Sequence, residues 1–254
     1  MRAPVAEVFS SVQGEGLYVG VRQVFVRTYG CDLECAYCDT PAARVETGPC
    51  RIEETPGEAG WSEVGNPVDS ELILRHLAAL GPTLGAHHSV ALTGGEPLLY
   101  AGFVGELAEG ARRLGLRSYL ETNGQRVEEL ESVIDGIDIV AMDVKLPSSQ
   151  PLAPGFDGAA FLARSLAFLQ VARRREVFVK VVCAAGTEAE EIEAVAQGIA
   201  EQSRDLLLVL QPATPRGPEE AVPAAQLLRL QELAARSLAE VRVIPQCHRM
   251  MGVR

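Results

Sequence analysis

Short apolar stretches alternate with amphipathic segments along most of the chain. Seven stretches rich in Val, Ile, Leu and Phe are predicted to be β-strands, over residues 23–28, 89–93, 118–122, 137–144, 177–183, 206–211 and 240–245. Several are apolar throughout, which is typical of parallel strands that are covered on both faces.

The segments between these strands carry apolar residues at every third or fourth position and are predicted to be helices. They span residues 70–80, 103–114, 127–134, 159–172, 189–200 and 224–238. A strand followed by a helix, repeated along the chain, predicts an α/β fold with a parallel sheet. The sheet forms either a full or partial (β/α) barrel or a doubly wound arrangement.

Two stretches lack this pattern. Residues 41–67 contain many Pro, Gly and Glu without periodicity, and they are predicted to form a long inserted loop. Residues 212–223 form a second Pro-rich connection. Because no internal repeat or low-complexity tract divides the chain, we predict one domain over residues 1–254.

Composition narrows the classes of protein. Hydrophobic residues make up 47% and charged residues 22% of the 254 residues, which predicts a folded globular chain. The net charge of −11, without a basic run, disfavours nucleic-acid binding. The sequence has no apolar stretch of about 18 residues and no signal-peptide pattern, so we expect a cytoplasmic protein that binds no membrane.

Polar and Gly-rich motifs follow successive predicted strands. They are Gly30–Thr40, Thr93–Pro97, Glu121–Gly124, Asp143–Lys145 and Gln211–Thr214. Parallel α/β folds build their sites at the C-terminal ends of the strands, so we expect these motifs to converge in space.

Three of the six cysteines lie close together, as Cys31, Cys35 and Cys38. In a cytoplasmic chain such a cluster points to metal or redox chemistry rather than disulfides. Structural zinc needs four ligands, whereas three thiolates on a 4Fe–4S cluster leave one iron open for another molecule. Zinc completed by a distant His or Asp, and three inert cysteines, remain alternatives. The other three cysteines have no metal-ligand spacing, and Cys183 is predicted to lie in the core.

The Cys loop, with Tyr37 before its last cysteine and a Gly-Gly-Glu-Pro motif after the next strand, resembles the radical S-adenosylmethionine enzymes. That resemblance implies a 4Fe–4S cluster held by Cys31, Cys35 and Cys38 in a full or partial barrel. The open iron then chelates S-adenosylmethionine, which is cleaved to a 5′-deoxyadenosyl radical.

Further motifs narrow the resemblance. Glu7–Gly16, Phe25–Cys31, Cys38–Thr40, Glu121–Gly124 and Val241–His248 are similar to the 7-carboxy-7-deazaguanine synthases, over nearly the whole chain except residues 41–67. The resemblance implies conversion of 6-carboxy-5,6,7,8-tetrahydropterin to 7-carboxy-7-deazaguanine with loss of ammonia. It also implies Mg²⁺, a homodimer and an electron donor such as flavodoxin or ferredoxin.

The same resemblance assigns roles to individual residues. It implies Thr40 as a magnesium ligand and Glu121 as a catalytic carboxylate, although a structural role for Glu121 stays open. Substrate contacts are implied for Val12, Gln13, Gly14, Glu15, Arg27, Thr93, His248 and Arg254. Contacts with S-adenosylmethionine are implied for Tyr37, Cys38, Asp39, Gly94, Gly95, Glu96, Asp143, Val144, Lys145, Gln211, Pro212, Ala213 and Thr214.

Other interpretations of these residues remain. Arg27 can lie at the barrel rim, Thr40 in an ordinary turn and His248 on a surface tail. Many members of the family have Ser-Pro-Lys where this chain has Asp143-Val144-Lys145, which is closer to the activases of glycyl-radical enzymes. An activase is therefore the alternative enzyme, and a non-catalytic iron–sulfur carrier is the alternative from another class.

Overall fold

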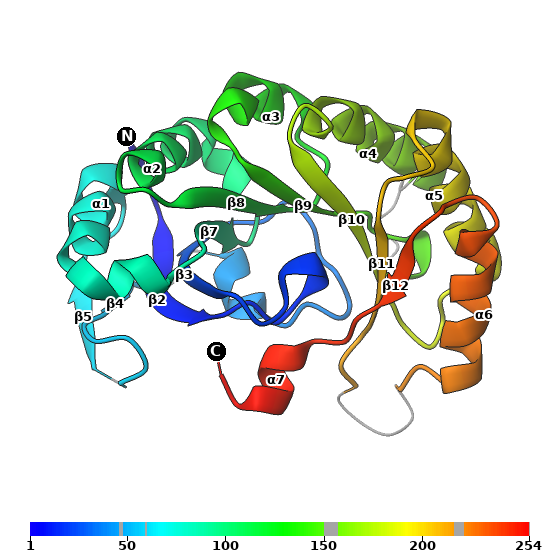
Figure 1. Cartoon of the computed structure of the whole chain (residues 1–254), viewed down its shortest axis with the longest axis horizontal. Coiled ribbons are helices and arrows are strands. Elements are labelled where there is room, and N and C mark those ends of the chain that lie inside the picture. Colours follow the sequence, from blue (N-terminus) through cyan, green and yellow to red (C-terminus); the bar gives the residue numbers. More distant parts are fainter. Residues whose placement is uncertain (46–47, 59, 150–156, 216–220, 254) are drawn as a thin grey trace.

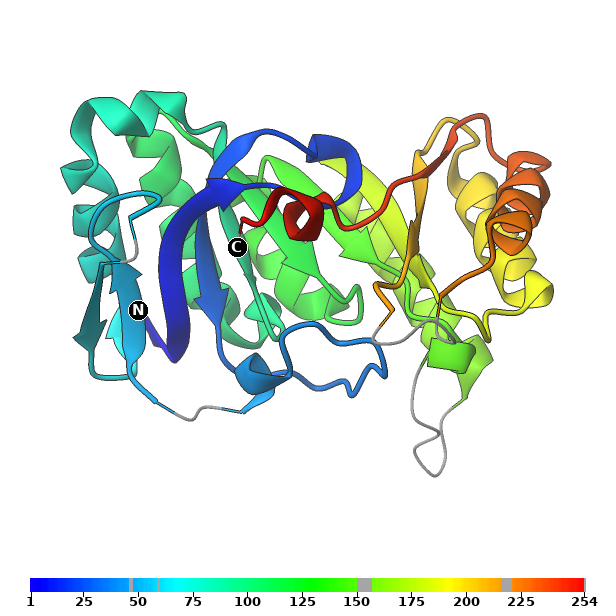
Figure 2. The same cartoon turned by 90° about the horizontal axis from the view of Figure 1, so that it is seen from below.

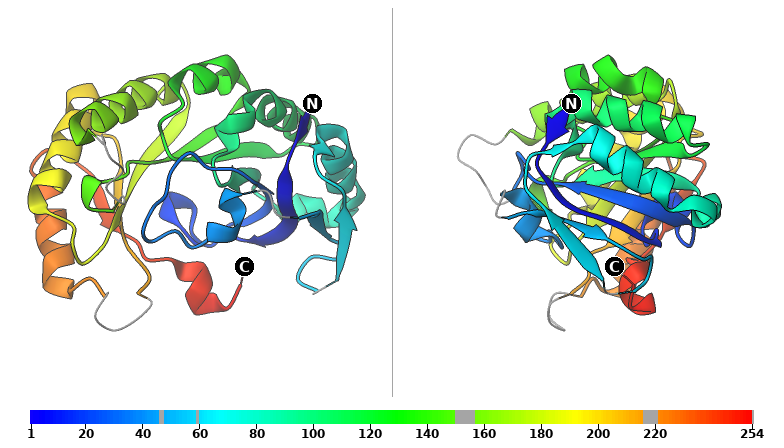
Figure 3. Two further views of the ribbon diagram at one scale, coloured as in Figure 1. Left: turned by 180° about the vertical axis from the view of Figure 1, so that it is seen from behind. Right: turned by 90° about the vertical axis from the view of Figure 1, so that its left-hand side faces the viewer.

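The computed structural model describes residues 1–45, 48–58, 60–149, 157–215 and 221–253. Within these residues one sheet has ten strands, in the order β12-β11-β10-β9-β8-β7-β3-β2-β4-β5, and a second sheet pairs β1 (Arg2–Ala3) with β6 (Val68–Asp69). The large sheet curves around an interior, and helices cover its outer face (Figures 1 and 3). Its two edge strands do not pair with each other, so the barrel is partial.

The parallel part of the sheet contains all seven predicted strands. They are β3 (Arg22–Thr28), β7 (Ser89–Gly94), β8 (Arg117–Thr122), β9 (Ile139–Asp143), β10 (Glu176–Cys183), β11 (Leu208–Pro212) and β12 (Val241–Val243). The predicted α/β fold is thereby confirmed, in its partial-barrel form.

The six predicted helices are present as well. They are α1 (Ser70–Ala79), α2 (Ala101–Arg113), α3 (Val127–Val133), α4 (Gly158–Ala172), α5 (Ala189–Gln202) and α6 (Ala224–Ala235). Asp69 and Asp157 cap α1 and α4 by accepting backbone N–H groups, and Glu188 with Glu191 forms a capping box on α5.

Alternation along the strands divides the apolar residues between two layers. In β3, Val24 and Val26 belong to the large core between sheet and helices, while Phe25 faces the interior. The same period places Phe9, Tyr119 and Phe178 in an inner apolar cluster. The interior of the barrel therefore has an aromatic floor.

Strand β2 (Val5–Val12) and part of the 41–67 segment differ from expectation. The strand pairs with β3 in antiparallel fashion and was not predicted. The prediction of a loop over 41–67 is wrong for β4 (Cys50–Glu53) and β5 (Trp61–Val64), a hairpin that extends the sheet beyond β2. Strands of four residues are too short to show a periodicity in a Gly- and Glu-rich segment.

The C-terminal segment crosses the open side of the partial barrel. After β12 the chain runs back toward β2 and forms α7 (Cys247–Met251), which lies across the interior when viewed from below (Figure 2). Among the described residues no helix is long and apolar enough to span a membrane.

One buried carboxylate attaches the hairpin to the sheet. Glu53 is 6% exposed and accepts the N–H groups of Ser10 at 2.8 Å and Gly57 at 3.0 Å. Replacing Glu53 by Ala removes both hydrogen bonds and leaves the partly buried Ser10 N–H group without an acceptor, which costs about 2 kcal/mol. We expect Glu53→Ala to lower the Tm by about 6 °C in calorimetry. The exposed neighbour Glu54 supplies the control, and a Glu54→Ala effect as large as that of Glu53→Ala would contradict this assignment.

Candidate active site

A cavity of about 210 Å³ lies above the aromatic floor, at the C-terminal ends of the parallel strands. On β3 and on β7 to β11 the last residue of the inner apolar cluster is followed two positions later by a polar one, so Phe25 precedes Arg27 and Tyr119 precedes Glu121. The polar layer consists of Arg27, Thr93, Glu121, Asp143, Lys180 and Gln211. The predicted convergence of the motifs that follow the strands is therefore present.

The Cys loop forms one wall of this cavity. Cys31, Cys35 and Cys38 all line it and are partly exposed. The loop is held from outside, because Asp32 accepts a hydrogen bond from Asn123 at 2.8 Å and pairs with Arg126 at 3.0 Å. Three thiol side chains on one wall fit a cluster that keeps one iron for another ligand.

Two glycines allow the next strand end to approach the Cys loop. A Cβ at Gly94 would overlap the backbone of Thr28, and its φ is +141°. At Gly95 a Cβ would overlap the carbonyl group of Gly30. Both positions therefore require glycine, and they leave backbone at the cavity wall.

Glu96 acts differently from its neighbours. Its carboxylate is fully buried and accepts hydrogen bonds from Leu98 N–H, Thr122 Oγ1 and Asn123 N–H, at 2.8–3.0 Å. Burial raises the pKa of Glu96 to about 7. The side chain does not line the cavity, so it supports the loop after β8, and any contact with a cofactor falls to its backbone.

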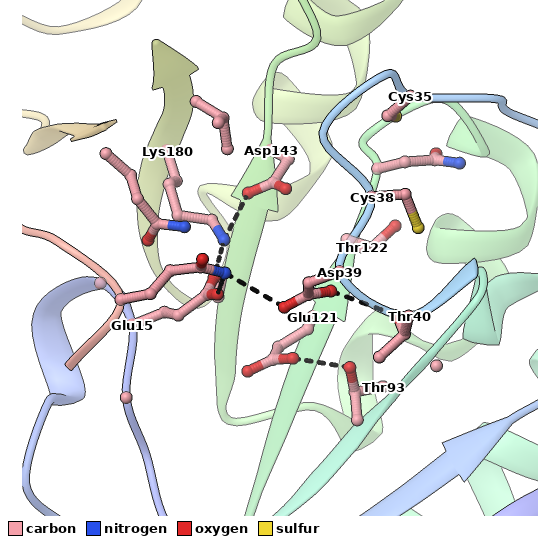
Figure 4. A pocket seen from close by; sticks show the side chains of 18 of the residues that line it. Glu15, Cys35, Cys38, Asp39, Thr40, Thr93, Glu121, Thr122, Asp143 and Lys180 are labelled. Atoms are coloured by element: carbon pink, nitrogen blue, oxygen red, sulfur yellow. Dashed lines mark hydrogen bonds and ion pairs between the residues drawn. The ribbon is translucent and has the colours of Figure 1, made fainter. Parts of the chain in front are cut away.

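A buried lysine connects two acidic side chains of the cavity. Lys180 pairs with Glu15 and lies 3.3 Å from Asp143 (Figure 4). Burial alone would raise the pKa of Glu15, but the charge and hydrogen bond of Lys180, with help from Gln246 and Gln211, lower it to about 2. Glu15 is therefore ionised at neutral pH.

A second carboxylate faces the same cavity in a different setting. Glu121 accepts a hydrogen bond from Thr93 Oγ1 at 2.6 Å and from Gln13 Nε2 at 2.7 Å. Burial raises the pKa of Glu121, and the negative charge of Glu15 raises it further, against the effect of these hydrogen bonds. The site thus holds two carboxylates with opposite tendencies toward protonation.

Oxygen ligands for a divalent cation lie beside the Cys loop. Asp39 and Thr40 both line the cavity, with Thr40 Oγ1 at 3.3 Å from Asp39 Oδ1. Glu15, Asp39 and His248 also place ligand atoms within 4.8 Å of one another. Because Lys180 already neutralises Glu15, the Asp39–Thr40 pair is the better match for Mg²⁺, which prefers hard oxygen ligands.

Most predicted site residues line the cavity. The exceptions are Glu96, Val144 and Pro212, of which Val144 is buried in the core. Arg254 lies outside the described residues. Arg27 lines the cavity and donates from Nε to Glu7 at 3.0 Å. Cys50 and Cys183 are buried, in line with the core position predicted for Cys183.

Several lining residues were not predicted. They include the aromatic residues of the floor, Lys180 and Gln246, as well as Leu33, Arg44 and Val182. The sequence did contain an indication for Lys180: it is a charged residue within an apolar strand, two positions after Phe178 and therefore on the same face. Gln246 lies in the Val241–His248 motif, but its hydrogen-bond partners are far from it in the sequence.

Comparison with known proteins assigns the class. Residues 25–197 match the model of the radical SAM superfamily, so the chain is a radical S-adenosylmethionine enzyme with a 4Fe–4S cluster and S-adenosylmethionine as cofactors. The crystal structure of QueE from Escherichia coli has the same fold, with a TM-score of 0.58 and 20% identity, covering 98% of this chain and 95% of that one.

Curated relatives define the family. The chain is 44% identical to the 7-carboxy-7-deazaguanine synthase of Geobacter sulfurreducens, over 98% of this chain and 97% of that protein. It is 36% identical to the enzyme of the same name from Methanothermobacter thermautotrophicus, over 100% of this chain and 99% of that protein. The chain belongs to the 7-carboxy-7-deazaguanine synthase family, and the predicted family is confirmed.

The close approach at Gly95 gives a test of the Cys-loop wall. Gly95→Ala pushes this backbone away from Gly30, and a displacement of about 1 Å at a reacting centre can cost about 100-fold in rate. We therefore expect reductive cleavage of S-adenosylmethionine to fall about 100-fold. Gly85→Ala is the matched control, because a Cβ there meets nothing within 4 Å. Equal rates in the two variants would refute the role of this contact.

The pairing of Glu15 with Lys180 predicts a pH-dependent stability. The pKa of Glu15 falls from 4.5 to about 2 on folding, so its contribution is present above pH 4.5 and disappears as the pH falls toward 2. We expect Glu15→Gln to lower the free energy of unfolding by about 2–3 kcal/mol at pH 7 and by much less at pH 3. Urea unfolding of the cluster-free chain measures both values, with the exposed Glu63→Gln as control. A deficit that is the same at both pH values would count against the ion pair.

Proposed function

We propose that this chain converts 6-carboxy-5,6,7,8-tetrahydropterin to 7-carboxy-7-deazaguanine with loss of ammonia. The observation that carries the proposal is the shared cavity: the Cys loop, two carboxylates of opposite tendency and an aromatic floor enclose one small space. The aromatic floor offers flat apolar support of the kind that a bicyclic heterocycle needs. The similarity to the synthases along the whole chain supports the same reaction.

Cys31, Cys35 and Cys38 would hold the 4Fe–4S cluster. When bound and reduced, the cluster supplies the electron that cleaves S-adenosylmethionine to a carbon radical able to abstract hydrogen. The chain's own part is to bind and orient: the backbone of Gly94 and Gly95 lines the space next to the Cys loop. Asp143 and Lys145 form an ion pair at its edge, with Lys145 Nζ 5.4 Å from the ring centre of Tyr37.

The aromatic floor and the polar layer would hold the pterin. Phe9 and Phe25 stack with ring centres 5.1 Å apart and offer an apolar support for a flat ring. Arg27 brings a positive charge that can pair with the substrate carboxylate. Glu121, whose pKa is raised by burial and by the charge of Glu15, would give or take a proton during loss of ammonia.

Magnesium has a place in this arrangement. Asp39 and Thr40 would hold Mg²⁺ at the cavity wall, where its charge can organise the carboxylate of the substrate. His248 faces the same space from the C-terminal segment. We also expect a single cytoplasmic domain that forms a homodimer and takes its electron from a donor such as flavodoxin or ferredoxin, since the reaction needs one low-potential electron.

The activase alternative is less favoured by the geometry. An activase must admit a glycine in the backbone of a partner protein, whereas here Gln246 and His248 of the C-terminal segment line the cavity and α7 crosses the interior of the barrel (Figure 2). A small-molecule substrate is the better match for a cavity that the C-terminal segment narrows in this way.

Turnover tests the proposal directly. After anaerobic reconstitution, the protein with S-adenosylmethionine, Mg²⁺, a reductant and 6-carboxytetrahydropterin should yield 7-carboxy-7-deazaguanine by mass spectrometry, and Cys35→Ala should yield none. Glu121→Gln should reduce product formation about 100-fold while leaving cleavage of S-adenosylmethionine in place. Formation of 5′-deoxyadenosine alone in the parent protein would disprove the substrate, and an inert protein with a verified cluster would disprove the reaction.

A further inference from the structure

One side chain of the C-terminal segment contacts three loops of the cavity. The Gln246 amide nitrogen donates to Glu15 Oε1 at 2.6 Å and to Asp39 Oδ2 at 3.1 Å. Its amide oxygen accepts a hydrogen bond from the hydroxyl of Thr214. These three partners come from the loop after β2, the Cys loop and the loop after β11 (Figure 4 shows Glu15 and Asp39 facing each other).

The residues that follow Gln246 depend on polar contacts for their position. Cys247 N–H donates to Gly14 O at 2.8 Å, and the His248 side chain packs so tightly on Gly14 that a Cβ there would overlap the imidazole. No residue of α7 is buried, and Met250 is 80% exposed. Apolar burial therefore contributes little to holding this helix over the cavity.

The chemistry of an amide suits this junction. Ionised carboxylates only accept hydrogen bonds, so a bridge between two of them requires a group with two N–H donors. A Gln amide has these two donors, and it keeps an oxygen for the Thr214 hydroxyl. A Glu of the same shape would add a third negative charge beside Glu15 and Asp39, and an Ala would remove the bridge.

We propose that Gln246 is a positioning residue: it fixes the C-terminal segment over the cavity, with His248 on it, and sets the distance between the substrate loop at Glu15 and the Cys loop at Asp39. Its effect on substrate binding rests on the proposed function, whereas its effect on the C-terminal segment does not. Among the described residues, the side-chain hydrogen bonds of Gln246 go to Glu15, Asp39 and Thr214, and none of these three is a cysteine or part of the aromatic floor.

Hydrogen exchange with mass spectrometry tests the structural part on the full, cluster-loaded chain. We expect amides of residues 247–253 to exchange about tenfold faster in Gln246→Ala, because hydrogen bonds to two charged groups are lost, and faster still in Gln246→Glu. Gln226→Ala is the matched control, since Gln226 on α6 donates to the carbonyl oxygens of Ala185 and Thr187 away from the cavity. Unchanged exchange in both Gln246 variants, or free exchange already in the parent protein, would overturn the proposal.

Steady-state kinetics test the functional part. Gln246→Ala should raise the KM for the pterin at least about tenfold, with a smaller change in kcat and unchanged iron content. A merely structural side chain would lower the amount of folded, cluster-loaded protein and leave the KM as it was. If the parent protein forms no product from the pterin, the proposed function fails while hydrogen exchange still decides the role of Gln246. A KM equal to that of the parent, despite faster exchange, would refute the positioning of substrate.

Discussion

The site depends on one ammonium group shared between two carboxylates. Lys180 is 12% exposed, and so cut off from most of the solvent that would otherwise stabilise its charge. Glu15 and Asp143 supply that stabilisation. Glu15 needs Lys180 for the same reason, whereas Asp143 also pairs with Lys145. A charge in this position fixes β9, β10 and the loop after β2 relative to one another. The C-terminal segment is attached to the same group, because Gln246 donates a hydrogen bond to the other carboxylate oxygen of Glu15.

This arrangement is possible because successive side chains of a β-strand point to opposite faces of the sheet. Phe178 and Lys180 point to the same interior, while Val179 and Val181 fill the core under the helices. Each strand thus contributes to the stability of the fold with one face and to the chemistry with the other. The aromatic floor below the polar layer keeps water away from the base of the cavity, which strengthens the electrostatic interactions above it.

Local patterns in the sequence were sufficient for the parallel strands, the helices and the Cys loop. The hairpin β4–β5 escaped because its four-residue strands are too short for a pattern, and β2 escaped because Glu7, Ser10 and Ser11 interrupt its apolar residues. Glu96 was expected to contact the cofactor, but its side chain turns to Thr122 and Asn123, a contact that depends on the three-dimensional approach of two loops. The roles of Lys180 and Gln246 were not predicted for a related reason. Each role depends on hydrogen-bond and ion-pair partners that lie far away in the sequence.

The contact between Gln246 and Glu15 joins residues 231 positions apart. At a translation rate of about 5–20 residues per second, the loop that carries Glu15 leaves the ribosome roughly 10–50 s before its partner does. During that interval the Cys loop and the strands behind it can already form, while the side of the barrel that α7 later crosses stays open. The wall that Gln246 and His248 contribute is therefore the last part of the cavity to be synthesised.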